Sequence, residues 1–325
     1  MPLAVTLLLL CGASVLAIAY LVSAVSGLGM ALAAGRIAEL SPRGQSRVYL
    51  GLAWLPLLLG VLCTITALAP SFGWVADHCL APTEDTHHHL CLSHGALHWS
   101  GPWLLLLGGI FSTKLVWTLT GVLMRGWQGR QLKQKLMATS RESAEGYHVL
   151  GLDEPQAFVV GTLGPVIFIS RGLLAPEHRE HLEAVLAHER AHLQNRDPLQ
   201  RLVTQLALIF HLPGLAGWIQ RNLSRTQEMA ADASAAEELA SAEQVAAAIV
   251  SLARWQTIEA APIAAVFTGS EIEARVNRLL DEPPAGDQPS VQFLMTLAIL
   301  LLALITLSVD PIHHGVELLL GALNH

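Results

Sequence analysis

Four long runs of apolar residues stand out from the mixed polar and apolar pattern along the chain. They cover about residues 3–25, 49–69, 103–124 and 291–309. A helix needs roughly 20 apolar residues to cross a bilayer, and in lipid it satisfies its own backbone hydrogen bonds. We therefore predict four transmembrane helices. The first run lacks the basic start and short apolar core of a signal peptide, which favours a true span.

The stretch between the third and fourth runs, residues 125–290, has a different pattern. Two short runs of β-type composition, 156–160 and 165–170, flank a Gly-Thr-Leu-Gly turn and predict a hairpin. Beyond the hairpin, apolar positions recur with helical spacing. Residues 199–219 are strongly apolar but are interrupted by Arg201, Gln205, His211 and Pro213, so we predict a buried or membrane-grazing helix pair there. The stretch as a whole is expected to be an α+β domain.

The overall composition supports a membrane protein. Hydrophobic residues make up 52% of the chain and charged residues only 14%, with a mean hydropathy of +0.47, which is typical of lipid-facing helices. The net charge of -7 gives no reason to expect direct binding of nucleic acid, because phosphate contacts need a concentrated basic face.

Basic residues are distributed unevenly among the connections between the runs. They occur between the first two runs and directly after residue 124, whereas the loop 71–102 contains no Lys or Arg. Positive residues stay on the cytoplasmic side of a membrane. We therefore expect a cytoplasmic domain at 125–290, with the loop, the N-terminus and a short tail at 310–325 outside. Lys114, inside the third run, is expected to face the helix bundle or a water-filled pocket, or to snorkel.

The chemistry centres on a His-Glu-x-x-His motif within a helical pattern. His188 and His192 are four residues apart and so lie on one face of a helix, where both imidazoles can reach one metal ion. Zinc suits neutral imidazole and keeps a coordination position open for water. Glu189, beside the first histidine, is the candidate catalytic base. The competing interpretation of the motif is a surface helix with two ordinary histidines.

A second predicted helix supplies a candidate third ligand. Glu228 lies in the sequence Gln-Glu-Met-Ala-Ala-Asp, and Asp232 follows four residues later on the same face. Three protein ligands are usual for a catalytic zinc ion, and a nearby carboxylate can orient a ligand histidine. The alternative is that both residues belong to a solvated acidic face of the helix, and the nearby Glu237 and Glu238 show that such faces occur in this segment.

Two segments together resemble a known family. The run AVLAHERAHLQNRDPLQRLV, followed by RTQEMAADASAA, resembles the membrane zinc metallopeptidases of the BlaR/MecR antibiotic-sensor type. It is similar, more distantly, to the HtpX and CAAX-protease group. The upstream QAFVVGTLGPVIFISRGLL also resembles that family's strand pair and entry helix. The receptors carry a penicillin-binding sensor domain and its Ser-x-x-Lys motif, which this sequence lacks, so we expect a stand-alone member.

The resemblance implies a zincin-like gluzincin peptidase domain with one zinc ion per chain. It places His188, His192 and Glu228 on the metal and Glu189 as the base. It implies supporting roles for Asp197 and Asp232, and Arg275 in EARVNRLL resembles an arginine that recurs after the active site. Further candidates for stabilising a developing oxyanion are Tyr147, His148, His211 and Arg275.

Two other features have open interpretations. The predicted hairpin has either an exposed edge that pairs with an extended peptide substrate or a purely structural role. The outer loop contains His87, His88 and His89 together with Cys79 and Cys91, a set suited to metal binding or a disulfide; the alternative is a plain polar loop.

These observations predict a zinc-dependent endopeptidase in the bacterial inner membrane that cleaves a protein or peptide at the cytoplasmic side. A transcriptional repressor and a membrane protein are both candidate substrates, in a regulatory or signalling pathway. One alternative is a signal transducer with a structural or degenerate zinc site, and another is a quality-control peptidase of the HtpX or CAAX-protease kind. Membrane lipid is an expected partner, and assembly into a homo-oligomer is left open.

Overall fold

The computed structural model describes residues 3–69, 102–257, 262–281, 312 and 315–316. The predicted outer loop with its histidines and cysteines, His87, His88, His89, Cys79 and Cys91, lies outside the described residues. So do the predicted fourth membrane helix at 291–309 and nearly all of the tail at 310–325.

The first three helices of the described structure are α1 (Leu3–Ala38), α2 (Pro42–Ala67) and α3 (Pro102–Thr139). Among the described residues, two helical stretches are long and apolar enough to cross a membrane, Leu8–Ala38 and Pro42–Ala67. The predicted crossing at 103–124 is helical within α3, but α3 is not among these two, so a third span stays a prediction.

A tight turn joins α1 to α2 and makes them antiparallel neighbours. The Ser41 hydroxyl accepts a hydrogen bond from the Gly44 amide at the start of α2, and Pro42 occupies the first helical position. The two helices then approach closely at Gly60, where an added Cβ would lie 2.7 Å from the Val15 carbonyl oxygen. Small residues allow this kind of close helix packing in membranes.

A small mixed sheet follows α3. Its strands are β1 (Arg141–Glu142), β2 (His148–Leu150), β3 (Ala157–Val160) and β4 (Val166–Ser170), in the order β1-β2-β4-β3. The predicted hairpin is confirmed: β3 and β4 are antiparallel, and Gly161 and Gly164 take positive φ angles in the turn. β3 is an edge strand, so its outer side is not paired within this sheet.

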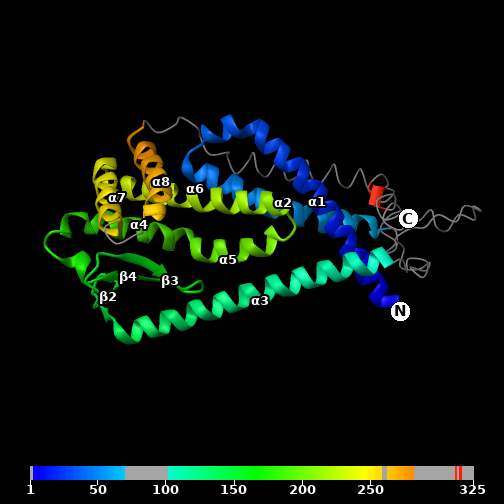
Figure 1. Cartoon of the computed structure of the whole chain (residues 1–325), viewed down its shortest axis with the longest axis horizontal. Helices are drawn as coiled ribbons and strands as arrows, with labels where there is room; N and C mark the ends of the chain where they lie inside the picture. The colour runs from blue at the N-terminus through cyan, green and yellow to red at the C-terminus, as the bar shows by residue number, and fades with distance from the viewer. Residues whose placement is uncertain (1–2, 70–101, 258–261, 282–311, 313–314, 317–325) are drawn as a thin grey trace, which may run out of the picture.

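Helices make up the rest of the domain. They are α4 (Leu182–Asn195), α5 (Asp197–Leu208), α6 (Pro213–Leu239), α7 (Ala242–Thr257) and α8 (Pro262–Leu280). α4 packs against the sheet, α6 and α7 through a shared apolar core that includes Ile169, Leu186 and Ala235. The sheet, α7 and α8 lie at the end of the molecule opposite the N-terminus of α1 (Figure 1).

The turn between α5 and α6 packs directly on the candidate membrane helices. Ile209 and Phe210 share an apolar cluster with Leu16 and Ala19 of α1, and α2 contributes to the next cluster along. The apolar segment 199–219 is therefore a helix pair packed against α1 and α2, as predicted. That it does not cross the membrane stays a prediction.

Candidate metal centre

α4 places the two motif histidines one helical turn apart, on the side that faces α6. The residues around them on α4, including Val185, Leu186 and Ala187, are buried and fix the helix against the core. α4 ends where Arg196 takes a left-handed conformation, with φ 55° and ψ 37°. That bend starts α5 at Asp197 and turns the aspartate carboxylate back toward α4.

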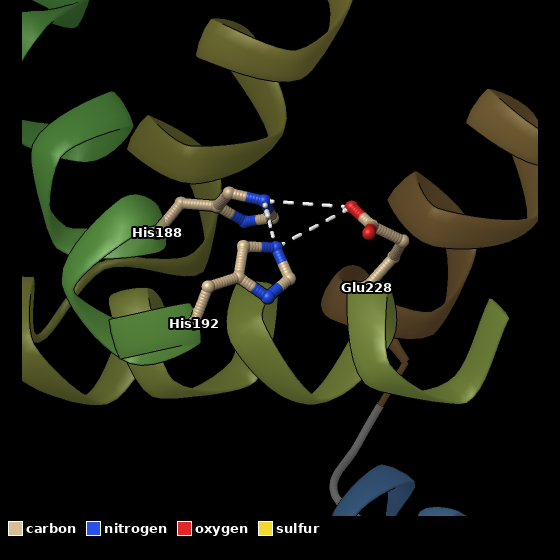
Figure 2. Close-up of side chains that lie close together, drawn as sticks. All are labelled: His188, His192 and Glu228. Carbon is tan, nitrogen blue, oxygen red and sulfur yellow. Dashed lines mark hydrogen bonds and ion pairs between the residues drawn. The ribbon is translucent and has the colours of Figure 1, made fainter. Parts of the chain in front are cut away.

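Glu228 on α6 completes the cluster (Figure 2). Its Oε2 atom is 3.5 Å from His188 Nε2 and 3.7 Å from His192 Nε2. The two Nε2 atoms are 3.1 Å apart. In the part of the chain that the structure describes, these three residues are the group whose ligand atoms converge within 4.8 Å of one another.

Each histidine is held by a buried carboxylate on its other ring nitrogen. His188 Nδ1 donates to Asp232 Oδ1 at 2.8 Å, and His192 Nδ1 donates to Asp197 Oδ2 at 2.6 Å. Both aspartates are almost fully buried. Such carboxylates fix the tautomer in which Nδ1 carries the proton and Nε2 offers its lone pair.

The donor set fits a zinc ion. Two lone pairs that face each other across 3.1 Å repel unless a proton or a cation lies between them. Ligand atoms at about 2.0–2.1 Å from zinc in tetrahedral geometry are about 3.3 Å apart, close to the three separations found here. Two imidazoles and one carboxylate also match the ligand types that zinc takes in hydrolytic sites.

Two arginines compensate the carboxylates of the cluster. Arg275 on α8 donates through Nε and Nη2 to the two oxygens of Asp232, each at 2.7 Å, and its Nη1 is 3.9 Å from Glu228 Oε2. Arg201 on α5 donates to Glu228 Oε1 at 2.8 Å. The Oε2 atom of Glu228 is therefore the one left facing the histidines.

The protonation of the cluster follows from this network in the metal-free protein. Burial alone would lower the pKa of His188, but hydrogen bonds to Asp232 and Glu228 outweigh it and raise that pKa to about 9. Burial would raise the pKa of Glu228, yet its bonds to both histidines bring it below its ordinary value. Glu189 differs, because burial raises the pKa of its carboxyl group and the nearby imidazoles only partly offset that effect. A carboxyl group of this kind is suited to accepting and returning a proton.

A cavity of about 280 Å³ opens beside the cluster. His188, Glu189, Glu228 and Arg275 form its polar end. Its other walls are apolar and come from β3, α4, α7 and α8: Ala157, Ala184, Val185, Ala248, Ile249, Leu252, Ala253 and Ile272. An apolar group can thus be buried within reach of the three candidate ligands.

Of the four candidates for oxyanion stabilisation, the structure brings Arg275 to the cavity. The other three do not line it, which corrects those predictions. Tyr147 is buried in the core, and His148 Nδ1 is 3.1 Å from Ser140 Oγ with its ring against Phe168. His211 lies between the candidate membrane helices α1 and α2, with Nδ1 3.1 Å from Ser23 Oγ and Nε2 3.2 Å from the Ala53 carbonyl oxygen.

Sequence reasoning missed Arg201. It follows Asp197 by four residues on α5, so both side chains face the cluster from one side of that helix. The four-residue spacing between Asp197 and Arg201 could have indicated that Arg201 also faces the candidate ligands.

Comparison with known proteins agrees with this geometry. Residues 128–217 match Peptidase family M48, a segment that contains His188, Glu189 and His192 and ends before Glu228. The chain is also similar to the protease HtpX homolog of Aquifex aeolicus (strain VF5), with 29% identity over 117 residues, 33% of this chain and 38% of that relative. The match thus spans less than half the length of the relative. No solved structure matches the chain significantly. The matched segment is similar to the M48 metallopeptidases. The predicted resemblance to membrane zinc metallopeptidases is confirmed, and the relative found is of the HtpX kind.

Proposed function

We propose that this protein is a zinc-dependent endopeptidase of the bacterial cytoplasmic membrane that cleaves a protein substrate on the cytoplasmic side. The observation that carries the proposal is the convergence of His188, His192 and Glu228, each restrained by a second partner, beside a cavity that contains Glu189. His188, His192 and Glu228 would hold one zinc ion per chain.

A zinc ion at these ligands would polarise the substrate carbonyl group and lower the pKa of water toward about 7. Glu189 is positioned to take the proton from the attacking water and to pass it to the leaving amine. Arg275 lies in the cavity wall and brings positive charge close to the place where the carbonyl oxygen becomes negative. Asp197 and Asp232 keep both imidazoles oriented through the reaction.

The edge strand β3 supports a mode of substrate binding. Ala157, its first residue, lines the cavity, and β3 pairs on one side only within the sheet. An extended peptide that pairs with the free side of β3 would run past the candidate metal ligands. Its side chains would enter a cavity whose walls are largely apolar, so the best substrates would carry an apolar residue next to the scissile bond.

The placement of the peptidase domain, 125–290, in the cytoplasm rests on the distribution of Lys and Arg. A transcriptional repressor and a membrane protein both remain candidate substrates. The similarity to a protease HtpX homolog favours a second candidate function, a quality-control peptidase of the HtpX kind.

The test uses the full chain in detergent or lipid nanodiscs. The wild type should contain one zinc ion and cleave an unfolded protein substrate, and Glu189→Gln should retain the zinc but lose at least about 100-fold in kcat. Glu183→Gln is the matched control, because Glu183 lies on the same helix with its side chain largely exposed. Comparing the proteomes of wild-type and Glu189→Gln cells would then identify substrates.

Full activity of Glu189→Gln, or a wild-type protein that cannot be loaded with zinc, would overturn the proposal.

A further inference from the structure

A second cavity, of about 540 Å³, lies between α3 and the turn that joins α5 to α6. It is separate from the metal centre and shares no lining residue with the catalytic cavity. The turn that forms its floor packs through Ile209 on Leu16 and Ala19 of α1, within the candidate membrane span Leu8–Ala38. The cavity therefore opens beside helices that lie in or next to the bilayer.

The cavity is lined by two cations and by no Asp or Glu. Lys114 donates from Nζ to the Tyr20 hydroxyl at 2.7 Å and to the Ile209 carbonyl oxygen at 2.9 Å, and Nζ lies 5.2 Å from the centroid of the Tyr20 ring. These partners are neutral, so they orient the ammonium group without balancing its charge. Arg125 lines the same cavity, and no ion pair joins it to another described residue. A cation next to lipid without a counter-ion is unfavourable, and a bound anion would offset that.

The two cations are arranged along α3 in a way that suits an extended polar headgroup. Arg125 Nη2 would be 3.6 Å from a Cβ atom built on Gly121, one helical turn earlier. The guanidinium group is therefore turned back along the helix toward Lys114. Gly121 and Lys114 are about 10 Å apart along the helix axis. A phosphate at Arg125 would leave ester oxygens of the same molecule near Lys114, on the side of α3 farther from the basic segment that follows it.

The surface around the cavity is apolar. On α3, Val116, Trp117 and Leu123 have 62%, 81% and 71% of their surface exposed, and Trp117 also lines the cavity. Free inorganic phosphate would leave these side chains uncovered, whereas acyl chains would cover them. Trp is also enriched where a membrane protein meets the lipid headgroups.

We propose that this cavity binds the phosphate group of an anionic membrane phospholipid, with Arg125 on the phosphate and Lys114 on the ester region. The chemistry recognised is a phosphate monoanion on an acylated glycerol. The proposal is independent of peptidase activity and rests on the cations, the uncharged partners of Lys114 and the apolar rim.

The test is native mass spectrometry of the full-length protein equilibrated with an equimolar mixture of phosphatidylglycerol and phosphatidylcholine. The wild type should retain one phosphatidylglycerol per chain in preference to phosphatidylcholine. Arg125→Gln should lower that preference by about tenfold, as expected for the loss of one charged hydrogen bond. Lys114→Met should lower it as well. Arg130→Gln is the matched control, because Arg130 is exposed on the same helix and does not line the cavity.

Arg125 is exposed and forms no hydrogen bond with another described residue, so Arg125→Gln should fold even if Lys114→Met does not. Equal retention of the two lipids by the wild type would overturn the proposal. So would an equal loss in Arg125→Gln and Arg130→Gln. Displacement of the retained lipid by millimolar inorganic phosphate would show that free phosphate is the ligand and would overturn the assignment to a lipid.

Discussion

Replacing Asp232 by Asn isolates the role of the carboxylate that supports His188. Asp232 is 1% exposed and accepts three hydrogen bonds, two from Arg275 at 2.7 Å and one from His188 Nδ1 at 2.8 Å. Asn has nearly the same shape but carries no charge and has one acceptor atom. Its NH₂ group must face either the guanidinium or the imidazole, and both of these are donors.

The expected effect on zinc follows from the tautomer of His188. An amide that donates to Nδ1 would move the imidazole proton to Nε2, the atom that faces His192 and Glu228. Loss of such a supporting partner typically lowers metal affinity by about 10–100-fold, or about 1.4–2.7 kcal/mol. The fold also loses stability, because Arg275 keeps its charge but loses both hydrogen bonds to Asp232 and retains only the Glu228 carboxylate, 3.9 Å from its Nη1. Removing one member of a buried pair costs about 3–5 kcal/mol, and the lower end applies here because the Arg275 side chain is 22% exposed.

The assay is a competition titration of zinc against a chelator, with thermal unfolding measured on the same samples. Asp153→Asn is the matched control, because the side chain of that aspartate is 85% exposed and, among the described residues, forms an ion pair with Arg171 at the surface. It should leave zinc affinity unchanged. A folded Asp232→Asn protein with wild-type zinc affinity would refute the reasoning, since the buried carboxylate would then have no part in presenting the imidazole.

Two further predictions concern the metal-free protein and the substrate. Against the effect of burial, hydrogen bonds raise the pKa of His188 from 6.5 to about 9, so its contribution to stability is complete below about pH 6.5 and is lost as the pH rises through about 9. The unfolding temperature should fall across this pH window when a chelator is present. It should not fall in the same way with zinc bound, because zinc binds the neutral imidazole. Parallel curves of unfolding temperature against pH in the two conditions would contradict this prediction. Ala248→Leu should narrow the apolar end of the catalytic cavity and shift kcat/KM toward peptides with smaller side chains, by about 10–200-fold per methylene group. Ala247→Leu, exposed on the same helix, should leave the preference unchanged, and an equal shift in both variants would count against the assigned cavity.

The parts of the site that are local in sequence could be predicted. His188, Glu189 and His192 follow from helical spacing alone, because one turn of α4 contains all three. Glu228 and Asp232 lie on another helix, and spacing places them on one face of it without saying what that face meets. The need of a catalytic zinc ion for a third ligand suggested that link, and the resemblance implied it as well. The packing of α6 on α4 brings the residues together.

The misplaced candidates show why polar residues in apolar segments mislead. His211 interrupts the apolar stretch 199–219 and was one of the candidates for oxyanion stabilisation. Its actual partners, Ser23 and the Ala53 carbonyl oxygen, belong to α1 and α2, more than 150 residues away in sequence. Its polarity serves the contact between helices, and no local pattern distinguishes that role from a catalytic one. Asp197 differs from His211, because it does lie at the site, as the resemblance implied. The left-handed conformation of Arg196 that directs its carboxylate toward His192 has no signal in the sequence.

The two candidate membrane helices, α1 and α2, are part of the framework that holds the candidate metal centre. The α1–α2 turn contacts two of the helices that build the site: Arg43 bonds to Ser234 and Glu237 on α6, and Arg278 on α8 donates to the Leu40 carbonyl oxygen at 2.7 Å. α6 carries Glu228, and α8 carries the arginine that holds Asp232.

α2 also packs along α6, and the α5–α6 turn is fastened to α1 and α2 through His211. Removal of the first two helices would therefore expose apolar faces of α5 and α6 and release α8 from one of its supports. A protein built this way needs α1 and α2 in order to assemble its candidate metal centre, whether or not they also cross a membrane.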